Sequence, residues 1–476
     1  MISSPGLGSG LDINGIVSQL MAIEQRPLLQ LSTKEAKQQA ELSAYGNLKS
    51  ALSTFQGTVK TLANSSLFTG VKASIVDSTV ASVSATSSAE IGAHQIEVQA
   101  LAQAQKIKSE SFTSSSDIVG SGTLTIAFGT YNGDGTFTEN LKKASASITI
   151  ESDQTSLANI RDAINKASIG VTASIVNDGN GNRLVLSSND SGLSNALKIT
   201  VSDNDLSNTD NNGLSKLAYD ISTGGTANMS ETVVARDAIL VIDGITITKP
   251  SNTITDALQG MTINLFKENP GTTTSSSVTK DTTSVQTAVS TFVNAYNELQ
   301  KTIASLSNYD QINQQASILT GDSTVRAVQN QLRGILNSSL QSSVAGGLST
   351  LSQVGISFQK DGTLLLDNSK LSASLNDPLK DVSSLFATNG FAVKIDQLID
   401  GMLKKNGLID GRMDGINTSI KDIDKQREAL GSRLEIIEKR FRAQFTALDT
   451  TIASMKQTSE FLAQQLSSLP GANTNN

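Results

Sequence analysis

The chain has 476 residues, a formal net charge of −7 and no cysteine. The lack of cysteine excludes disulfides, thiol catalysis and cysteine-ligated zinc, and the negative charge leaves no broad basic field to attract nucleic acid or anionic lipid. Hydrophobic residues make up 38% and aromatic residues 4% of the chain, so we expect several domains with thin cores.

The sequence has the features of neither a membrane span nor a cleaved signal. A membrane-crossing helix needs about 20 predominantly apolar residues, and no run approaches that length. The first basic residue is Arg26, and polar residues interrupt positions 2–20, which does not fit a secretory signal peptide. We therefore expect no membrane insertion and, if the chain leaves the cell, export without a cleaved signal.

Two helical patterns occupy the N-terminal part. A leader rich in Gly and Ser (3–12) ends at Asp12, which fits the N-cap of a short helix that Pro27 is expected to interrupt. The apolar face expected for this helix consists of Ile13, Ile16, Leu20 and Ile23. A second helix is expected between Leu42 and Leu62, where apolar residues recur in steps of three and four.

From about residue 73 to 281 the apolar spacing becomes that of strands. Alternating runs beside Asn-, Asp- and Gly-rich turns predict β-hairpins. The predicted strands are 94–101, 123–128, 171–176, 183–187, 238–242 and 245–248. Short helices are expected at 156–164 and 253–258, and residues 202–232, rich in Ser, Asn and Asp, are expected to form a surface loop.

Helical spacing returns near residue 284. The apolar seam over 285–306 favours an ordinary intramolecular bundle, and Asp322 fits the N-cap of another helix. A hairpin is expected over 355–367 and a helix over 391–404. Gly411 and Gly415 are expected to loosen the chain after that helix.

A heptad seam between Met413 and Leu469 dominates the C-terminal part, and only Arg427 and Ser459 are polar within it. Such a seam predicts a helix that lies against another helix, from this chain or from another copy. At about 1.5 Å per residue the helix would be about 80 Å long, too long for the core of a compact domain. Two successive steps of four residues at Phe441 predict a stutter in the supercoil.

We predict that this seam is the assembly surface, and that it lacks its full partner surface in the free chain. The residues predicted to form the assembly seam are Ile420, Ile423, Leu430, Leu434, Ile437, Phe441, Phe445, Leu448 and Ile452.

Candidate chemical motifs are weak. Ser277–Lys280 matches S-x-x-K and Ser202–Asn204 matches S-D-N, but their order is reversed relative to serine acylases and no K-T-G follows. The sequence after Asp178 resembles a calcium loop, yet Arg183 stands where Gly is needed, so a hairpin turn is the better interpretation. His94 is the only histidine and is expected to be a packing residue. We therefore expect no enzyme activity, cofactor or metal.

The order helix, β, helix implies nested domains. The expected fold class is α+β and multidomain, with a terminal α-helical coiled coil, a helical-bundle domain and two nested β-rich inserted domains. The expected parts are a coiled-coil leg (1–42 with 405–476), a helical domain (43–72 with 282–404), an inner β domain (73–116 with 234–281) and an outer β domain (117–233).

Several segments resemble the bacterial flagellar filament-cap family, FliD or hook-associated protein 2. Residues 6–28, beginning GLGSGLDINGIV, and residues 45–55 are similar to its N-terminal region. Similarity to its C-terminal region is found in residues 319–336, 354–367 and 440–466. The segment SLANIRDAINKASIGVTASIVNDGNGNRLVLSS (156–188) resembles a motif shared by flagellins and hook-associated proteins.

The resemblance implies a homo-oligomeric ring, with a pentamer favoured, at the distal tip of the extracellular flagellum. It implies type III export with an export chaperone, promotion of flagellin polymerisation and filament elongation, and prevention of flagellin leakage. In that family the terminal helices form legs, a helical domain contacts the filament and β domains form a plate. Two alternatives remain: a hook–filament junction protein, and a host-surface adhesin whose β domains bind mucin.

Overall fold

The computed structural model describes residues 10, 12–341, 347–377 and 381–467. The chain divides into two compact units, one formed by Met1–Phe68 with Thr282–Asn476 and the other by Thr69–Asp281. The first unit is mainly helical and the second mainly antiparallel β, which confirms the expected α+β class. We describe each unit by itself.

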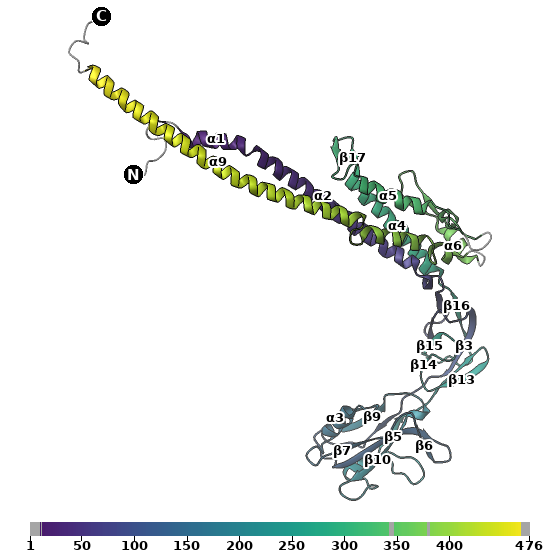
Figure 1. Cartoon of the computed structure of the whole chain (residues 1–476). Coiled ribbons are helices and arrows are strands. Elements are labelled where there is room, and N and C mark those ends of the chain that lie inside the picture. Colours follow the sequence, from purple (N-terminus) through teal and green to yellow (C-terminus); the bar gives the residue numbers. More distant parts are fainter. Residues whose placement is uncertain (1–9, 11, 342–346, 378–380, 468–476) are drawn as a thin grey trace. The chain divides into compact units, whose positions relative to one another are not determined.

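The elements of the first unit come from both ends of the chain. They are α1 (Ile13–Glu24), α2 (Arg26–Ala63), η1 (Ser65–Leu67), α4 (Thr282–Ser307), β17 (Tyr309–Asp310), β18 (Gln315–Ala316), α5 (Ser323–Leu336), η4 (Leu351–Val354), β19 (Ile356–Phe358), β20 (Leu364–Leu366), α6 (Asn368–Asn376), α7 (Val382–Phe386), α8 (Phe391–Leu403) and α9 (Leu408–Ser467). Figure 1 shows α1 and α2 running beside α9.

The helical core lies among α2, α4, α5, α8 and the start of α9. Phe55 of α2 lies between two rings of α4, with centroids 5.4 Å from Phe292 and 5.8 Å from Tyr296. The apolar side chains of the 285–306 seam are buried in this core, so that seam belongs to an intramolecular bundle as expected. The helix expected after Asp322 is confirmed, because its carboxylate accepts from the backbone N–H groups of Thr324 and Val325.

The interruption expected at Pro27 is confirmed, because α1 ends at Glu24 and Pro27 lies in the first turn of α2, where its missing N–H costs no hydrogen bond. Two other expectations about these helices were wrong. The buried face of α1 is formed by Ile13, Val17 and Met21, whereas Ile23 is 57% exposed. Gly411 and Gly415 lie inside α9, since a glycine costs a helix only about 1 kcal/mol and buried apolar residues beside them hold the helix in place.

Residues 69–281 form the second unit and contain four larger sheets. Their elements are β1 (Val71–Ile75), β2 (Ala81–Ala85), β3 (Gly92–Ala100), β4 (Lys106–Lys108), β5 (Gly122–Tyr131), β6 (Phe137–Glu139), β7 (Ala146–Ile150), α3 (Leu157–Ala167), β8 (Val171–Asn177), β9 (Asn182–Ser188), η2 (Leu193–Asn195), β10 (Ala196–Asp203), η3 (Gly213–Leu217), β11 (Ser230–Val233), β12 (Ala238–Ile242), β13 (Ile245–Lys249), β14 (Thr253–Ile254), β15 (Met261–Leu265) and β16 (Thr274–Lys280).

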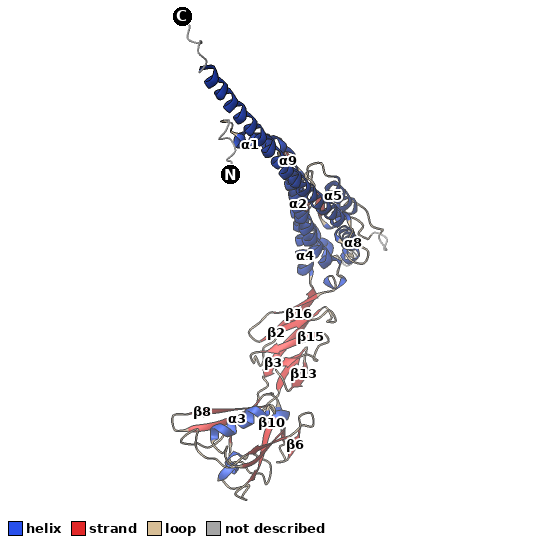
Figure 2. Ribbon diagram, turned by 60° about the vertical axis from the view of Figure 1, so that its left-hand side comes forward, coloured by secondary structure: helices blue, strands red, loops and turns tan. Residues whose placement is uncertain are grey.

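These strands enclose two large apolar cores and a smaller one formed by Ala89, Met261 and Val278. The inner β cluster lies between the sheets β1-β16-β3-β12-β13 and β14-β15-β2, which Figure 2 draws in red. The outer β cluster lies between β10-β5-β6, with β7 also on β5, and β11-β4-β9-β8, and includes α3. Ile107 and Phe112 pack in the outer β cluster although they precede residue 117.

The hairpins of this unit confirm the predicted strands, and α3 confirms the helix expected at 156–164. Asp243 and Gly244 have φ values of 48° and 84°, as a two-residue hairpin turn of type I′ requires. The helix expected at 253–258 is wrong, because Thr253–Ile254 is strand β14 and pairs with β15.

The surface loop expected at 202–232 is confirmed only in part, because most of the segment lies outside helices and strands but its middle is buried. Four apolar side chains in this segment are buried in the outer β cluster: Leu214, Leu217, Tyr219 and Met229. The buried Asp203 carboxylate accepts from the backbone N–H of Ser215 at 2.8 Å, which satisfies polar groups that composition alone assigned to solvent.

Candidate functional site

The predicted assembly seam lies along one face of α9, and much of it is covered by the chain itself. Ile420 packs against the helical core, and Ile423 is buried. Five further seam residues belong to a second cluster formed with α1, which we call the leg cluster. Its members are Ile13, Val17, Met21 and Leu434, with Leu28, Leu430, Ile437, Phe441 and Phe445 packed against them.

The leg cluster brings the two ends of the chain together. Val17 of α1 is 1% exposed and Leu434 of α9 is 5% exposed, so each removes apolar surface from water. A polar contact fixes the same pairing, because Arg442 Nη1 donates to Asn14 Oδ1 at 3.0 Å. The seam up to Phe445 therefore has a partner in α1 within the same chain. Val17 and Met21 were missed, although both follow Ile13 at helical steps of four.

The polar seam position Arg427 has a specific partner. Its guanidinium forms an ion pair with Glu35 of α2, and a longer contact of 3.7 Å joins it to Asp424. Both Arg427 and Glu35 are partly buried, so the loss of either side chain would leave the other charge partly buried without its main partner. A charged residue in an apolar seam is a common device for fixing register. The sequence identified Arg427 as a polar residue in the apolar seam, but it did not indicate that Glu35 is its partner.

Charged contacts also hold the first turns of α9 on α2 and α5. Lys49 Nζ lies 3.3 Å from Asp410 Oδ1, and the Arg412 guanidinium lies 3.9 Å from Glu41 and 3.7 Å from Asp322. The N–H of Asn406 and then the Lys49 ammonium hold the pKa of Asp410 below its usual value. These contacts place the start of the seam against the helical core.

The C-terminal end of α9 is different. We define the uncovered stripe as Leu448, Met455, Phe461, Leu462 and Leu466, all exposed; Met455 is 67% exposed and Leu466 62%. Ile452 is partly exposed beside it, and Leu469 lies outside the described residues. Within the described part of the chain, none of these side chains joins an apolar cluster. Contiguous exposed apolar residues are typical of interaction surfaces.

The weak chemical motifs occupy structural positions. Ser277 lies on β16, where its hydroxyl is 3.0 Å from that of Ser74. Asp178 accepts from Arg183 across a hairpin turn at 2.6 Å. His94 Nδ1 lies 2.7 Å from Asp243 Oδ2 at the β12–β13 turn, a pairing the sequence did not suggest.

The described residues contain no group of three or more His, Cys, Asp or Glu side chains placed to hold a metal ion. Among the helices described, none is both long and apolar enough to cross a membrane.

Three family models match the chain. They are the flagellar hook-associated protein 2 N-terminus over residues 9–105, the flagellin hook IN motif over 125–190, and the flagellar hook-associated protein 2 C-terminus over 235–457. The matches at the two ends meet in the inner β cluster, and the IN motif lies in the outer β cluster. The matches therefore cover both units.

Curated relatives match over nearly the whole length. The flagellar hook-associated protein 2 of Escherichia coli K12 is 36% identical over 98% of both chains. The A-type flagellar hook-associated protein 2 of Pseudomonas aeruginosa is 33% identical over 98% of this chain and 97% of its own. A crystal structure of the flagellar cap protein FliD D1-D2-D3 domains from Escherichia coli covers 79% of this chain and 99% of its own, with 36% identity and a TM-score of 0.62.

Proposed function

We propose that this chain, which belongs to the flagellar hook-associated protein 2 family, is the cap at the distal tip of the flagellar filament. The observation that carries this conclusion is the 36% identity over 98% of both chains to the Escherichia coli protein. The chain is exported and acts outside the cell. There it promotes flagellin addition and prevents flagellin leakage, and it works by assembly and not by catalysis.

The chain has four parts in this proposal: a terminal leg, a helical domain, an inner β domain and an outer β domain. The four largest apolar clusters of the described residues support this division, namely the leg cluster, the helical core and the inner and outer β clusters, with a smaller cluster in the inner part. The inner–outer boundary is proposed to lie in the linkers near residues 101–105 and 234–237, and the packing of Ile107 in the outer β cluster supports this.

The seam of α9 serves assembly in two ways. Up to Phe445 it joins the two chain ends into one leg, because the leg cluster buries it against α1. Beyond Phe445, the uncovered stripe and the neighbouring Ile452 contact other subunits of the filament tip. The exposure of this stripe and its continuity with the leg cluster support that role.

The partners follow from the family. Copies of this chain form a ring, proposed as a pentamer from the family resemblance, and flagellin and an export chaperone are the other partners. Nothing on the described surface favours the junction or mucin-adhesin alternatives.

Electron microscopy of the purified full-length protein tests the ring. We expect a closed ring with a plate and legs, both alone and at the ends of flagellin filaments. Monomeric rods, or binding along the sides of filaments instead of their ends, would contradict the proposal.

A further inference from the structure

Two linkers connect the inner and outer β clusters, one before β4 and one before β12. They pair with each other, because Gln103 N donates to Arg236 O at 2.8 Å and Arg236 N donates to Gln103 O at 3.2 Å. Domains joined by short linkers move relative to each other by default, unless further contacts hold them. The contacts on both sides of this pair therefore decide whether the clusters move independently.

Side chains of the inner β cluster hold the linkers firmly. Glu268 Oε1 accepts from Arg236 Nη2 at 2.6 Å and from Leu101 N at 3.1 Å. The Asn252 amide bonds both backbone groups of Ala102, accepting from its N–H at 2.8 Å and donating to its carbonyl at 2.9 Å. These hydrogen bonds fix the linker residues Leu101, Ala102 and Arg236 to the inner part of the unit.

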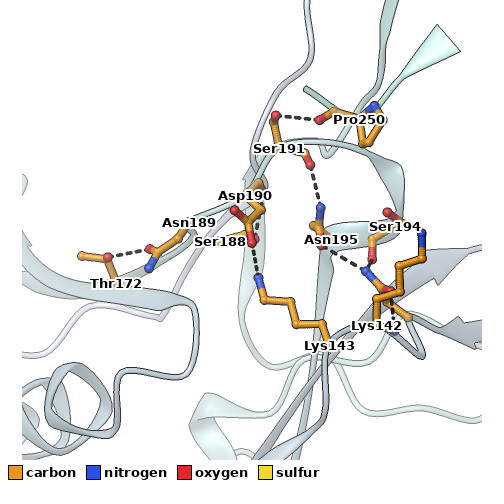
Figure 3. Close-up of polar contacts among 11 residues, drawn as sticks. Lys142, Lys143, Thr172, Ser188, Asn189, Asp190, Ser191, Ser194, Asn195 and Pro250 are labelled. Atoms are coloured by element: carbon orange, nitrogen blue, oxygen red, sulfur yellow. Dashed lines mark hydrogen bonds and ion pairs between the residues drawn. The ribbon is translucent and has the colours of Figure 1, made fainter. Parts of the chain in front are cut away.

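On the outer side, the contact is made by residues 189–195, which we call the joint loop (Figure 3). Ser191 Oγ donates to Pro250 O at 2.7 Å. Leu193 N donates to Asp237 Oδ1 at 2.8 Å. Gly192 N donates to Gln103 O at 3.2 Å. Three successive residues of the outer part therefore bond three separate segments of the inner part.

Gly192 makes this approach possible. Its φ of +99° favours glycine, and a Cβ at this position would lie 2.5 Å from the Cβ of Pro250. Real Cβ atoms do not approach other atoms so closely, so a larger residue would push the joint loop away from Pro250. The approach of the joint loop to Pro250 thus depends on the absence of a side chain at Gly192.

The joint loop is itself held to the outer β cluster. Asn195 Nδ2 donates to Ser191 O at 2.7 Å, which shapes the loop (Figure 3). Asp190 forms an ion pair with Lys143 at 2.7 Å, and Thr172 of β8 donates to Asn189 at 2.7 Å. The loop can therefore transmit a constraint from one cluster to the other.

We propose that the joint loop locks the inner and outer β clusters into one rigid body through Ser191, Gly192 and Leu193. The outer β cluster then keeps one orientation on the inner cluster, where a flexible boundary would let it swing. This rigidity is a property of the single chain and goes beyond the proposed function. In a cap it would give every subunit the same plate geometry.

Distance measurements between spin labels test the lock in the full chain. Because the chain has no cysteine, Thr248→Cys on β13 and Thr149→Cys on β7 give two specific labelling sites on exposed strand positions. The parent should give a narrow distance distribution. Ser191→Ala with Asp237→Ala, and separately Gly192→Val, should broaden it about twofold, as expected for domains freed to move.

Thr125→Ala is the matched control, because it removes a hydrogen bond between β5 and β7 inside the outer β cluster and none of those that hold the joint loop. Its distribution should stay as narrow as that of the parent. Circular dichroism identifies any variant that fails to fold, and the alanine pair keeps the test valid if Gly192→Val does so. Equal widths in the parent and the alanine pair would overturn the proposal. The result does not depend on ring formation, so it is distinguishable from failure of the cap proposal.

Discussion

Arg427 of α9 forms an ion pair with Glu35 of α2, at a polar position within an otherwise apolar seam. Both side chains are partly buried, and Arg427 Nε has no hydrogen-bond partner among the described residues. A charge in such a place stabilises the structure only while its partner is present. The pair therefore favours one register of α9 on α2 over registers in which each charge would face apolar neighbours.

Removing one member of this pair should destabilise the helical unit. Arg427→Ala or Glu35→Ala should each cost about 1–2 kcal/mol, between typical exposed and buried pairs. The double variant should cost less than the sum, since neither charge is left alone. Urea unfolding followed by helical circular dichroism measures this. Lys425→Ala, which removes an exposed i,i+3 contact with Asp422, should change little; strict additivity of the pair would argue against coupling.

Ile437→Asp should release α1 from α9 while leaving the β unit folded. Ile437 packs against the leg cluster, and replacing it with a carboxylate should cost about 2 kcal/mol or more. Hydrogen exchange should show faster exchange of α1 amides and unchanged protection of residues 69–281. Ile436→Asp is the control, because this neighbouring isoleucine is 68% exposed. Equal effects of the two changes would contradict the assigned face.

The uncovered stripe should matter for assembly and not for stability. Leu462→Asp and Leu466→Asp place charges on exposed positions of α9, so thermal unfolding of the monomer should not change. Ring formation and attachment to filament ends should be lost, because the stripe can no longer bury apolar surface. Gln464→Asp adds the same charge at an exposed polar position. If all three variants assembled normally, the stripe would have no role in contacts between subunits.

Acid should weaken the β12–β13 turn. The N–H of Gln95 and then the His94 side chain lower the pKa of Asp243. A lowered pKa in the folded state gives stability that is present above the ordinary value of about 3.9 and lost as pH falls through the folded pKa. Asp243→Asn keeps a residue that tolerates the turn's positive φ but has no charge to lose.

The melting temperature of Asp243→Asn should therefore lie below that of the parent near pH 7 and approach it near pH 3. Asp153→Asn lies at an exposed loop position. Its melting temperature should change between pH 7 and pH 3 by as much as that of the parent. If the melting temperatures of the parent and Asp243→Asn differed by the same amount at every pH in this range, the Asp243 charge would not contribute to stability.

Periodic segments were predictable, but the individual partners in long-range contacts were not. The steps of three and four in α9 and the Asp-Gly turn at 243–244 specify local structure directly. The pairing of Val17 with the leg cluster and of Glu35 with Arg427 joins residues far apart in the chain, so no local pattern contains it. Residues 202–232 misled because their few apolar side chains, such as Leu214 and Tyr219, are spaced irregularly among polar ones.

The most direct test of the cap function is the amount of monomeric flagellin released into the medium by the strain of origin. Deleting the gene should leave cells with few or no filaments and a high level of released flagellin. Restoring the full chain should return filaments and lower the released flagellin to the parental level, and the Leu462→Asp chain should not. If released flagellin stayed the same with and without this chain, the account of it as the filament cap would be contradicted.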